Sequence, residues 1–197
     1  WQANFLSPVL VASQTLPAGL TYTKSGSIPA TLFDSTGKLT YQGNNLFTYS
    51  GTMVTNWSGD RVTFSANSTT APDGTNTANT LTVNATGNYA SYLQTVTALV
   101  GTTYIFSLYV KAGTTDKVTL YFGGTTITAA SVVSGPGSAG SLSSGVIFSG
   151  LSSSQWSRIQ VTATPATASR NMVIYPNNWS VNTTGDSIYV WGPQLEA

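Results

Sequence analysis

The sequence predicts an all-β protein, an antiparallel β-sandwich, and three observations lead to that prediction. Short runs rich in Val, Ile, Tyr, Phe and Thr recur with the two-residue alternation of strands. Turn residues separate these runs, as in Pro72-Asp73-Gly74 and Pro176-Asn177-Asn178. No window carries Ala, Leu, Glu and Lys at helical spacing. Many short strands between tight turns are typical of a sandwich.

Ten segments fit this strand pattern. In chain order they are residues 61–65, 80–84, 90–98, 103–111, 117–122, 127–133, 146–149, 156–163, 170–175 and 187–191. The Ser- and Gly-rich residues 134–145 are expected to form a flexible loop, because this composition is that of a flexible linker.

The alternation also predicts which side chains face the core. In the strand expected at 103–111, the inward set is Tyr104, Phe106, Leu108 and Val110, and the outward set is Ile105, Ser107, Tyr109 and Lys111. In the strand expected at 117–122, Val118, Leu120 and Phe122 face inward, while Lys117, Thr119 and Tyr121 face outward.

The last expected strand carries apolar residues on both faces, with Ile188 and Val190 on one and aromatic residues on the other. Such a strand is expected inside a sandwich. Trp57, Trp156 and Trp191 are predicted to be core residues, because large aromatic side chains dominate sandwich cores.

If the strands at 103–111 and 117–122 pair as a hairpin, their outward tyrosines and lysines share one face, which Gln94 could join from a neighbouring strand. Aromatic faces stack on the C–H surfaces of sugars, while amides and ammonium groups bond hydroxyls. We therefore predict a glycan site formed by Gln94, Tyr109, Lys111, Tyr121 and Trp179. The alternatives are cross-strand packing for the tyrosines and loop packing or a subunit contact for Trp179.

Composition excludes several functions. Among 197 residues only 7% are charged, the formal net charge is +1, and there is no His or Cys. We expect no nucleic-acid partner, because such binding needs a basic surface. No apolar run reaches the length of a membrane-spanning helix, so no membrane insertion is expected. Without His, Cys or a paired carboxylate, the chain is predicted not to be an enzyme.

Residues 1–43 lack the strand rhythm and are predicted to form an extended N-terminal arm, followed by a domain at residues 44–197. The arm's apolar cluster is expected to attach the domain to another subunit, because apolar side chains are costly to expose. Burial of the cluster against the chain's own sandwich is the alternative. That cluster contains Trp1, Phe5, Leu6, Val9, Leu10 and Val11. Since the chain begins at Trp1 rather than Met, we expect a fragment or a processed form.

Several motifs in one order carry a resemblance. They are Asn44-Asn45-Leu46-Phe47-Thr48-Tyr49-Ser50, Trp57, Ala71-Pro72-Asp73-Gly74-Thr75, residues 101–113, Trp156-Ser157-Arg158 and Trp191-Gly192-Pro193-Gln194-Leu195-Glu196. Together they resemble the carbohydrate-binding-module-like jelly rolls of bacteriophage structural proteins, in head fibres, tail fibres and minor tail proteins. Residues 30–39 look like the segment that precedes such a domain. The resemblance implies an antiparallel jelly-roll β-sandwich.

For function, the resemblance implies an extracellular, non-enzymatic virion appendage protein that binds glycans on the host surface and forms a homo-oligomer. One alternative is a purely structural virion decoration or assembly module that contacts other virion subunits and binds no sugar. Another is a carbohydrate-binding module of a secreted bacterial enzyme. The scarcity of arginine leads us to expect a neutral polysaccharide, because anionic glycans recruit Arg side chains.

No organic cofactor is expected. Modules of the resembling type often hold a structural calcium ion, which here would use the oxygen ligands of Asp73, Asn76 and Glu196. An ordinary turn role for Asp73 is the alternative.

Overall fold

The computed structural model describes residues 31–33, 39–41, 45–87 and 89–197, with side chains from residue 45 onward. The chain divides into two units, Trp1–Asn44 and Asn45–Ala197. In the first unit, strands β1 (Thr31–Phe33) and β2 (Leu39–Tyr41) pair antiparallel. The apolar cluster predicted within residues 1–11 lies outside the described residues.

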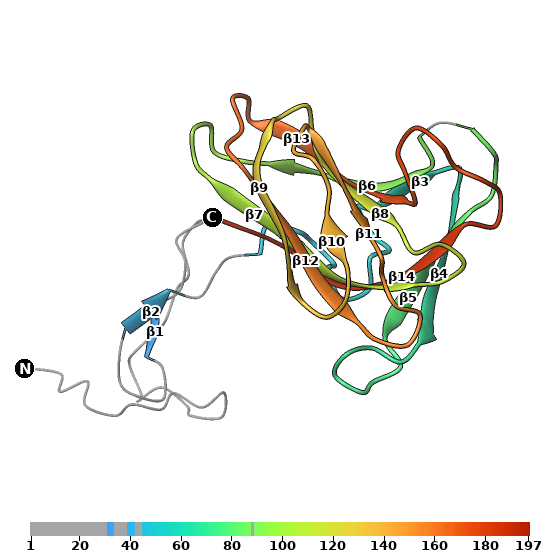
Figure 1. The fold of residues 1–197 in the computed structure, drawn as a ribbon. Coiled ribbons are helices and arrows are strands. Elements are labelled where there is room, and N and C mark those ends of the chain that lie inside the picture. The colour runs from blue at the N-terminus through green and yellow to red at the C-terminus, as the bar shows by residue number, and fades with distance from the viewer. Residues whose placement is uncertain (1–30, 34–38, 42–44, 88) are drawn as a thin grey trace, which may run out of the picture. The chain divides into compact units, whose positions relative to one another are not determined.

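The second unit is a sandwich of two six-stranded antiparallel sheets (Figure 1). Sheet I has the strand order β10 (Ser138–Ala139), β11 (Gly145–Ser149), β8 (Val118–Phe122), β13 (Ser169–Pro176), β6 (Ser91–Thr97) and β3 (Ser58–Asp60). Sheet II has the order β4 (Val62–Thr69), β5 (Ala78–Val83), β14 (Ser187–Glu196), β7 (Tyr104–Ala112), β12 (Ser157–Ala163) and β9 (Ile127–Ser134).

The chain crosses between the sheets at almost every connection. From β6 to β9, and again from β12 to β14, consecutive strands lie in opposite sheets. This wrapping is that of a jelly roll, so the predicted fold class is confirmed. Within the part of the chain that the structure describes, no helix is long and apolar enough to span a membrane.

Each of the ten expected strands overlaps an observed one, and the core is built as their alternation predicts. The predicted inward side chains of β7 and β8 are all buried. Of the predicted outward sets, Ile105 is exposed and Tyr109, Lys111 and Tyr121 are half-buried, whereas Ser107 and Thr119 are buried. Trp57 is 7% exposed, which confirms its predicted place in the core. Phe47 also enters the core, where its ring centroid lies 5.2 Å from that of Phe106.

Residues 134–145, expected to form a flexible loop, contain the two-residue strand β10. Gly135 has φ 82°, and a Cβ there would collide with the Trp156 carbonyl. Ser157 Oγ donates a hydrogen bond to the Pro136 carbonyl. The glycine therefore allows close backbone packing, a use that low-complexity composition does not reveal.

The expected pairing of β7 with β8 is wrong. β7 pairs with β14 and β12 in sheet II, whereas β8 pairs with β11 and β13 in sheet I. The connection between them docks on β14, where Gly113 N and Thr115 N both donate to the Ser187 carbonyl, at 3.2 and 3.3 Å. These long-range bonds carry the chain across to the other sheet, so no hairpin turn forms.

The predicted core placement of Trp156 and Trp191 is also wrong, because both are half-buried rather than part of the core. In β14 the inward positions belong to Ile188 and Val190, which are fully buried, so Trp191 points to the outer face of sheet II. Trp156 directly precedes β12 and donates Nε1–H to the Thr70 carbonyl at 3.3 Å.

Two buried tyrosines are expected to make the stability of the sandwich depend on pH in the alkaline range. Burial raises the pKa of Tyr92 to about 12. Burial, followed by the neighbouring Tyr121 and Tyr89, raises that of Tyr175 to about 12. An unfolded chain releases these protons near pH 10, so the folded state holds more protons between about pH 10 and 12. Stability should therefore fall as pH rises through this window.

Urea denaturation at a series of pH values would measure this loss. In Tyr92→Phe the decline between about pH 10 and 12 should be shallower, because one of the two groups no longer titrates. An identical slope in this variant and the parent chain would contradict the assignment.

Candidate functional site

The outer face of sheet II gathers aromatic and polar side chains from three adjacent strands. On the central strand β7, Tyr109 lies opposite Trp191 of β14 and Arg158 of β12. One pair further along, Ser107 lies opposite Gln194 on the β14 side. Because alternate residues point to the same face, these five side chains belong to one outward surface.

Ring contacts hold this surface together. The Tyr109 and Trp191 ring centroids are 5.6 Å apart at an interplanar angle of 58°. The guanidinium carbon of Arg158 lies 5.0 Å from the Tyr109 ring centroid. Lys111 Nζ lies 5.0 Å from the Tyr189 centroid and 5.2 Å from the Trp156 ring. Both cations therefore sit against aromatic faces, a favourable arrangement.

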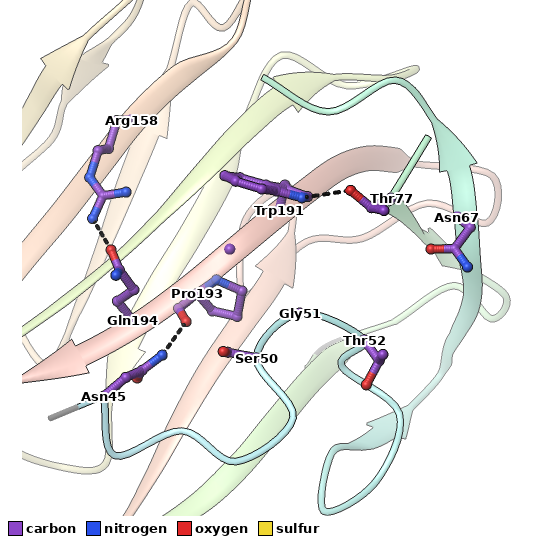
Figure 2. Close-up of a pocket in the computed structure, with 11 residues that line it drawn as sticks. Asn45, Ser50, Gly51, Thr52, Asn67, Thr77, Arg158, Trp191, Pro193 and Gln194 are labelled. Carbon is purple, nitrogen blue, oxygen red and sulfur yellow. Dashed lines mark hydrogen bonds between the residues drawn. The ribbon is translucent and has the colours of Figure 1, made fainter. Parts of the chain in front are cut away.

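A β-bulge opens a pocket beside these rings. The pairing of β14 with β7 shifts register between Trp191 and Gln194, and Gly192 has φ 57°, which favours glycine. The pocket has a volume of about 640 Å³ (Figure 2). Its lining is Asn45, Ser50, Gly51, Thr52, Asn67, Thr77, Arg158, Trp191, Gly192, Pro193 and Gln194.

One wall of the pocket is the loop that runs from Asn45 to Thr52 (Figure 2). The Asn45 side chain fastens this loop to β14: Nδ2 donates to the Pro193 carbonyl at 3.1 Å, and Oδ1 accepts from Leu195 N at 2.9 Å. Phe47, two residues later, is anchored in the core. The wall is thus attached to the sheet at both a polar and an apolar point.

Hydrogen bonds also fix the orientation of the pocket's functional groups. Trp191 Nε1–H donates to Thr77 Oγ1 at 3.0 Å (Figure 2). Arg158 Nη2 donates to Ser107 Oγ at 2.9 Å and to Gln194 Oε1. An indole face, an amide, hydroxyls and a guanidinium therefore surround one open space. The lining contains no carboxylate, so it provides binding groups without the carboxyl pair of glycoside hydrolysis.

The structure divides the predicted glycan site between the two sheets. Tyr109 and Lys111 lie on the outer face of sheet II. Tyr121 lies in sheet I, with its ring centroid 6.3 Å from that of Trp179 and an interplanar angle of 29°. Tyr121 also meets Tyr175 edge-on at 6.4 Å. The single predicted face does not form, because β7 and β8 are not neighbours.

Gln94 does not lie on an outward face either, since it is 2% exposed. Its Oε1 accepts from Thr48 N at 3.0 Å, and its Nε2 donates to the Thr48 carbonyl at 3.1 Å and to Thr48 Oγ1 at 2.9 Å. Gln94 therefore ties the segment before β3 to β6.

Replacing Gln94 with alanine should lower the free energy of unfolding by about 1–3 kcal/mol, because the buried Gln94 side chain and its three hydrogen bonds to Thr48 are lost. Urea denaturation would measure the loss. Thr95→Ala on the same strand, at an exposed position, is the matched control and should change stability by less than about 1 kcal/mol. Equal effects would show that the Thr48 contacts contribute nothing.

The sequence prediction missed Trp191, Arg158 and Gln194 as site residues. One signal was present, because the alternation of the last strand already separated Trp191 from the inward Ile188 and Val190. For Arg158 and Gln194 there was none, because their meeting depends on which strands are neighbours.

The three residues predicted to hold calcium come from two separate elements. Asp73 and Asn76 lie in the β4–β5 connection, whereas Glu196 lies opposite Ile105 at the end of β14. The Asp73 carboxylate already accepts from Thr75 N at 2.9 Å and Thr75 Oγ1 at 2.7 Å, and these bonds lower its pKa. Among the described residues, no group of three or more His, Cys, Asp or Glu side chains is placed to hold a metal ion.

No family model and no curated protein match this sequence. Similar solved structures include TmCBM61 bound to β-1,4-galactotriose, with 16% identity, a TM-score of 0.49 and coverage of 77% of this chain and 97% of that one. The CBM22-1 xylan-binding domain from Paenibacillus barcinonensis Xyn10C has 12% identity, a TM-score of 0.47 and coverage of 78% and 94%.

A third similar structure is the enzymatically active domain of tailspike protein 4 from bacteriophage CBA120, with 16% identity and a TM-score of 0.49. The matched region covers 77% of this chain but only 21% of the tailspike chain. At these identities the likeness concerns the fold alone.

Proposed function

We propose that this chain is a non-enzymatic carbohydrate-binding module whose binding site is the outer face of sheet II. The observation that carries the proposal is the indole of Trp191, which lines an open pocket together with the amide of Gln194 and the guanidinium of Arg158. A sugar ring presents a C–H face that stacks on an aromatic ring, and hydroxyls that bond amides and guanidinium groups.

Preorganisation supports this role. The Trp191 ring is held through Nε1 by Thr77 and lies against Tyr109, so a sugar would meet a stacking surface whose orientation is already set. Binding therefore costs little side-chain ordering. The site is nevertheless open, and such sites bind weakly, with dissociation constants of about micromolar to millimolar.

We propose further that the module is part of an extracellular bacteriophage virion appendage, in a head or tail fibre, and attaches it to host-surface glycans. Support comes from the motif order described above and from the low charge. Many copies on one particle would raise a weak affinity by two to four orders of magnitude, roughly, which is why we expect a homo-oligomer. A module of a secreted bacterial enzyme would use the same face.

The proposed role of residues 1–43 is attachment to a neighbouring subunit. Deleting them should leave a chain that melts cooperatively and still binds glycan, but that assembles less. Analytical ultracentrifugation of both chains would measure the oligomeric state. A truncated chain that does not fold would show that these residues belong to the domain.

A purely structural role has one specific observation in its favour, where the β5–β6 and β13–β14 connections meet. Tyr89 N donates to the Trp179 carbonyl at 3.0 Å, so the two backbone segments are adjacent, and the Tyr89 side chain is 55% exposed. Val181, two residues after Trp179, is 64% exposed. Such apolar side chains suit a subunit contact.

A glycan array probed with the full chain tests the proposal, using the same substitution on each sheet. Tyr109→Ala should weaken every glycan signal, since it removes the ring beside Trp191. Tyr121→Ala, on sheet I, should leave those signals unchanged. Absence of any glycan signal, combined with loss of assembly in Tyr121→Ala, would favour the purely structural role.

A further inference from the structure

Arg158 is an ionised side chain in the pocket without an ion-pair partner among residues 45–87 and 89–197. Its contacts are the Tyr109 ring, Ser107 Oγ and Gln194 Oε1, all uncharged. Gln194 connects Arg158 to one carboxylate, that of Glu196. This carboxylate accepts a hydrogen bond from Gln194 Nε2 at 3.5 Å and none from Arg158. A part-buried guanidinium with neutral neighbours retains a strong preference for an anion.

The guanidinium is held in a fixed orientation, and some of its N–H donors have no acceptor in the described residues. Ser107 and Gln194 both accept from Nη2, so the Nε–H and the Nη1 hydrogens have no acceptor in the described chain. Contacts at Nη2 and at the ring face hold the planar group in place. The remaining donors, Nε–H and the Nη1 hydrogens, lie on different edges of the guanidinium, so each can donate separately to an oxygen of an anion.

The other charges on this face reinforce the preference. Lys111 lies two residues from Tyr109 on the same outward side and is held between Trp156 and Tyr189. Glu196 is the only acidic side chain on the outward sides of β7, β12 and β14. Two cations and one carboxylate give this surface a positive balance, although the whole chain is nearly neutral.

We propose that the site selects a carboxylate-bearing sugar, with the carboxylate of a uronic acid bound by Arg158 and the sugar ring stacked on Trp191. The inference rests on the proposed carbohydrate-binding function. It replaces the expectation of a neutral polysaccharide, which was based on the scarcity of arginine. A single arginine is enough when it lines the stacking pocket.

The test compares two probes that differ only in charge, oligogalacturonate and its methyl ester, by titration calorimetry on the full chain. The acid should bind at least about tenfold more tightly at low salt, and the ratio should shrink as added salt screens the charges. The same array that tests the proposed function, with uronate, sulfated and neutral glycans, extends the comparison to other backbones.

Variants assign the preference to Arg158. Arg158→Gln should bring the acid-to-ester ratio close to one, and Arg158→Lys, which keeps the charge but not the planar group held on the Tyr109 ring, should give an intermediate ratio. Lys117→Gln is the matched control, because it removes the same charge beside β8 in sheet I and should leave the ratio unchanged. Thermal melts establish that each variant is folded.

The other possible results of these experiments overturn either the uronate preference, its assignment to Arg158, or the carbohydrate-binding function itself. Glycan binding with equal or greater affinity for neutral or only sulfated sugars overturns the inference and leaves the proposed function intact. A uronate preference that survives in Arg158→Gln overturns the assignment to this residue. Failure to bind any glycan overturns both proposals.

Discussion

Replacing Trp191 with alanine is expected to weaken glycan binding about thirtyfold, because the variant loses the central stacking surface of the pocket. Truncation of a tryptophan anchor commonly costs about 2 kcal/mol of binding free energy, which corresponds to that factor. Since Trp191 is half-buried on the outer face, stability should fall far less than for a core tryptophan. Calorimetric titration and a thermal melt of the same sample measure both quantities.

Two variants control this result. Trp191→Phe keeps a ring but loses the hydrogen bond to Thr77, so its affinity should be intermediate. Trp179→Ala removes an indole that stacks on Tyr121 of sheet I and should leave affinity unchanged. If Trp179→Ala and Trp191→Ala weaken binding equally, the site is not confined to sheet II.

Replacing Phe106 with alanine is expected to lower the free energy of unfolding by about 3–5 kcal/mol, the usual cost of removing a buried phenylalanine. Phe106 is fully buried on β7, and its ring contacts that of Phe47. The void would adjoin Phe47, which lies in the segment that carries the pocket wall. Urea denaturation is the appropriate measurement.

The neighbouring Ile105→Ala is the matched control for the core, since Ile105 is 41% exposed on the opposite face of the same strand. Its cost should stay below about 1 kcal/mol, as for most surface substitutions. Comparable losses in the two variants would mean that the inward and outward faces of β7 have been assigned incorrectly.

Only part of the candidate site was predictable from sequence. Tyr109 and Lys111 were expected to point outward, and they do, because side chains in a strand alternate whatever the strand pairs with. Tyr121 was also correctly expected to point outward. It was wrongly grouped with Tyr109 and Lys111, because β7 was assumed to pair with β8. The β7–β8 connection crosses the sandwich through bonds to Ser187, a residue about seventy positions away.

The sequence by itself determined the β class, the approximate position of every long strand and the inward faces of β7, β8 and β14. These features depend on turn residues and on a two-residue period, both of which are local. The tertiary structure alone decided that Trp191 lies beside Tyr109, that Arg158 meets Gln194, and that the bulge at Gly192 opens a pocket against the Asn45–Thr52 loop. Those contacts join distant segments, and their partners are chosen by the global burial of both sheets rather than by any local pattern.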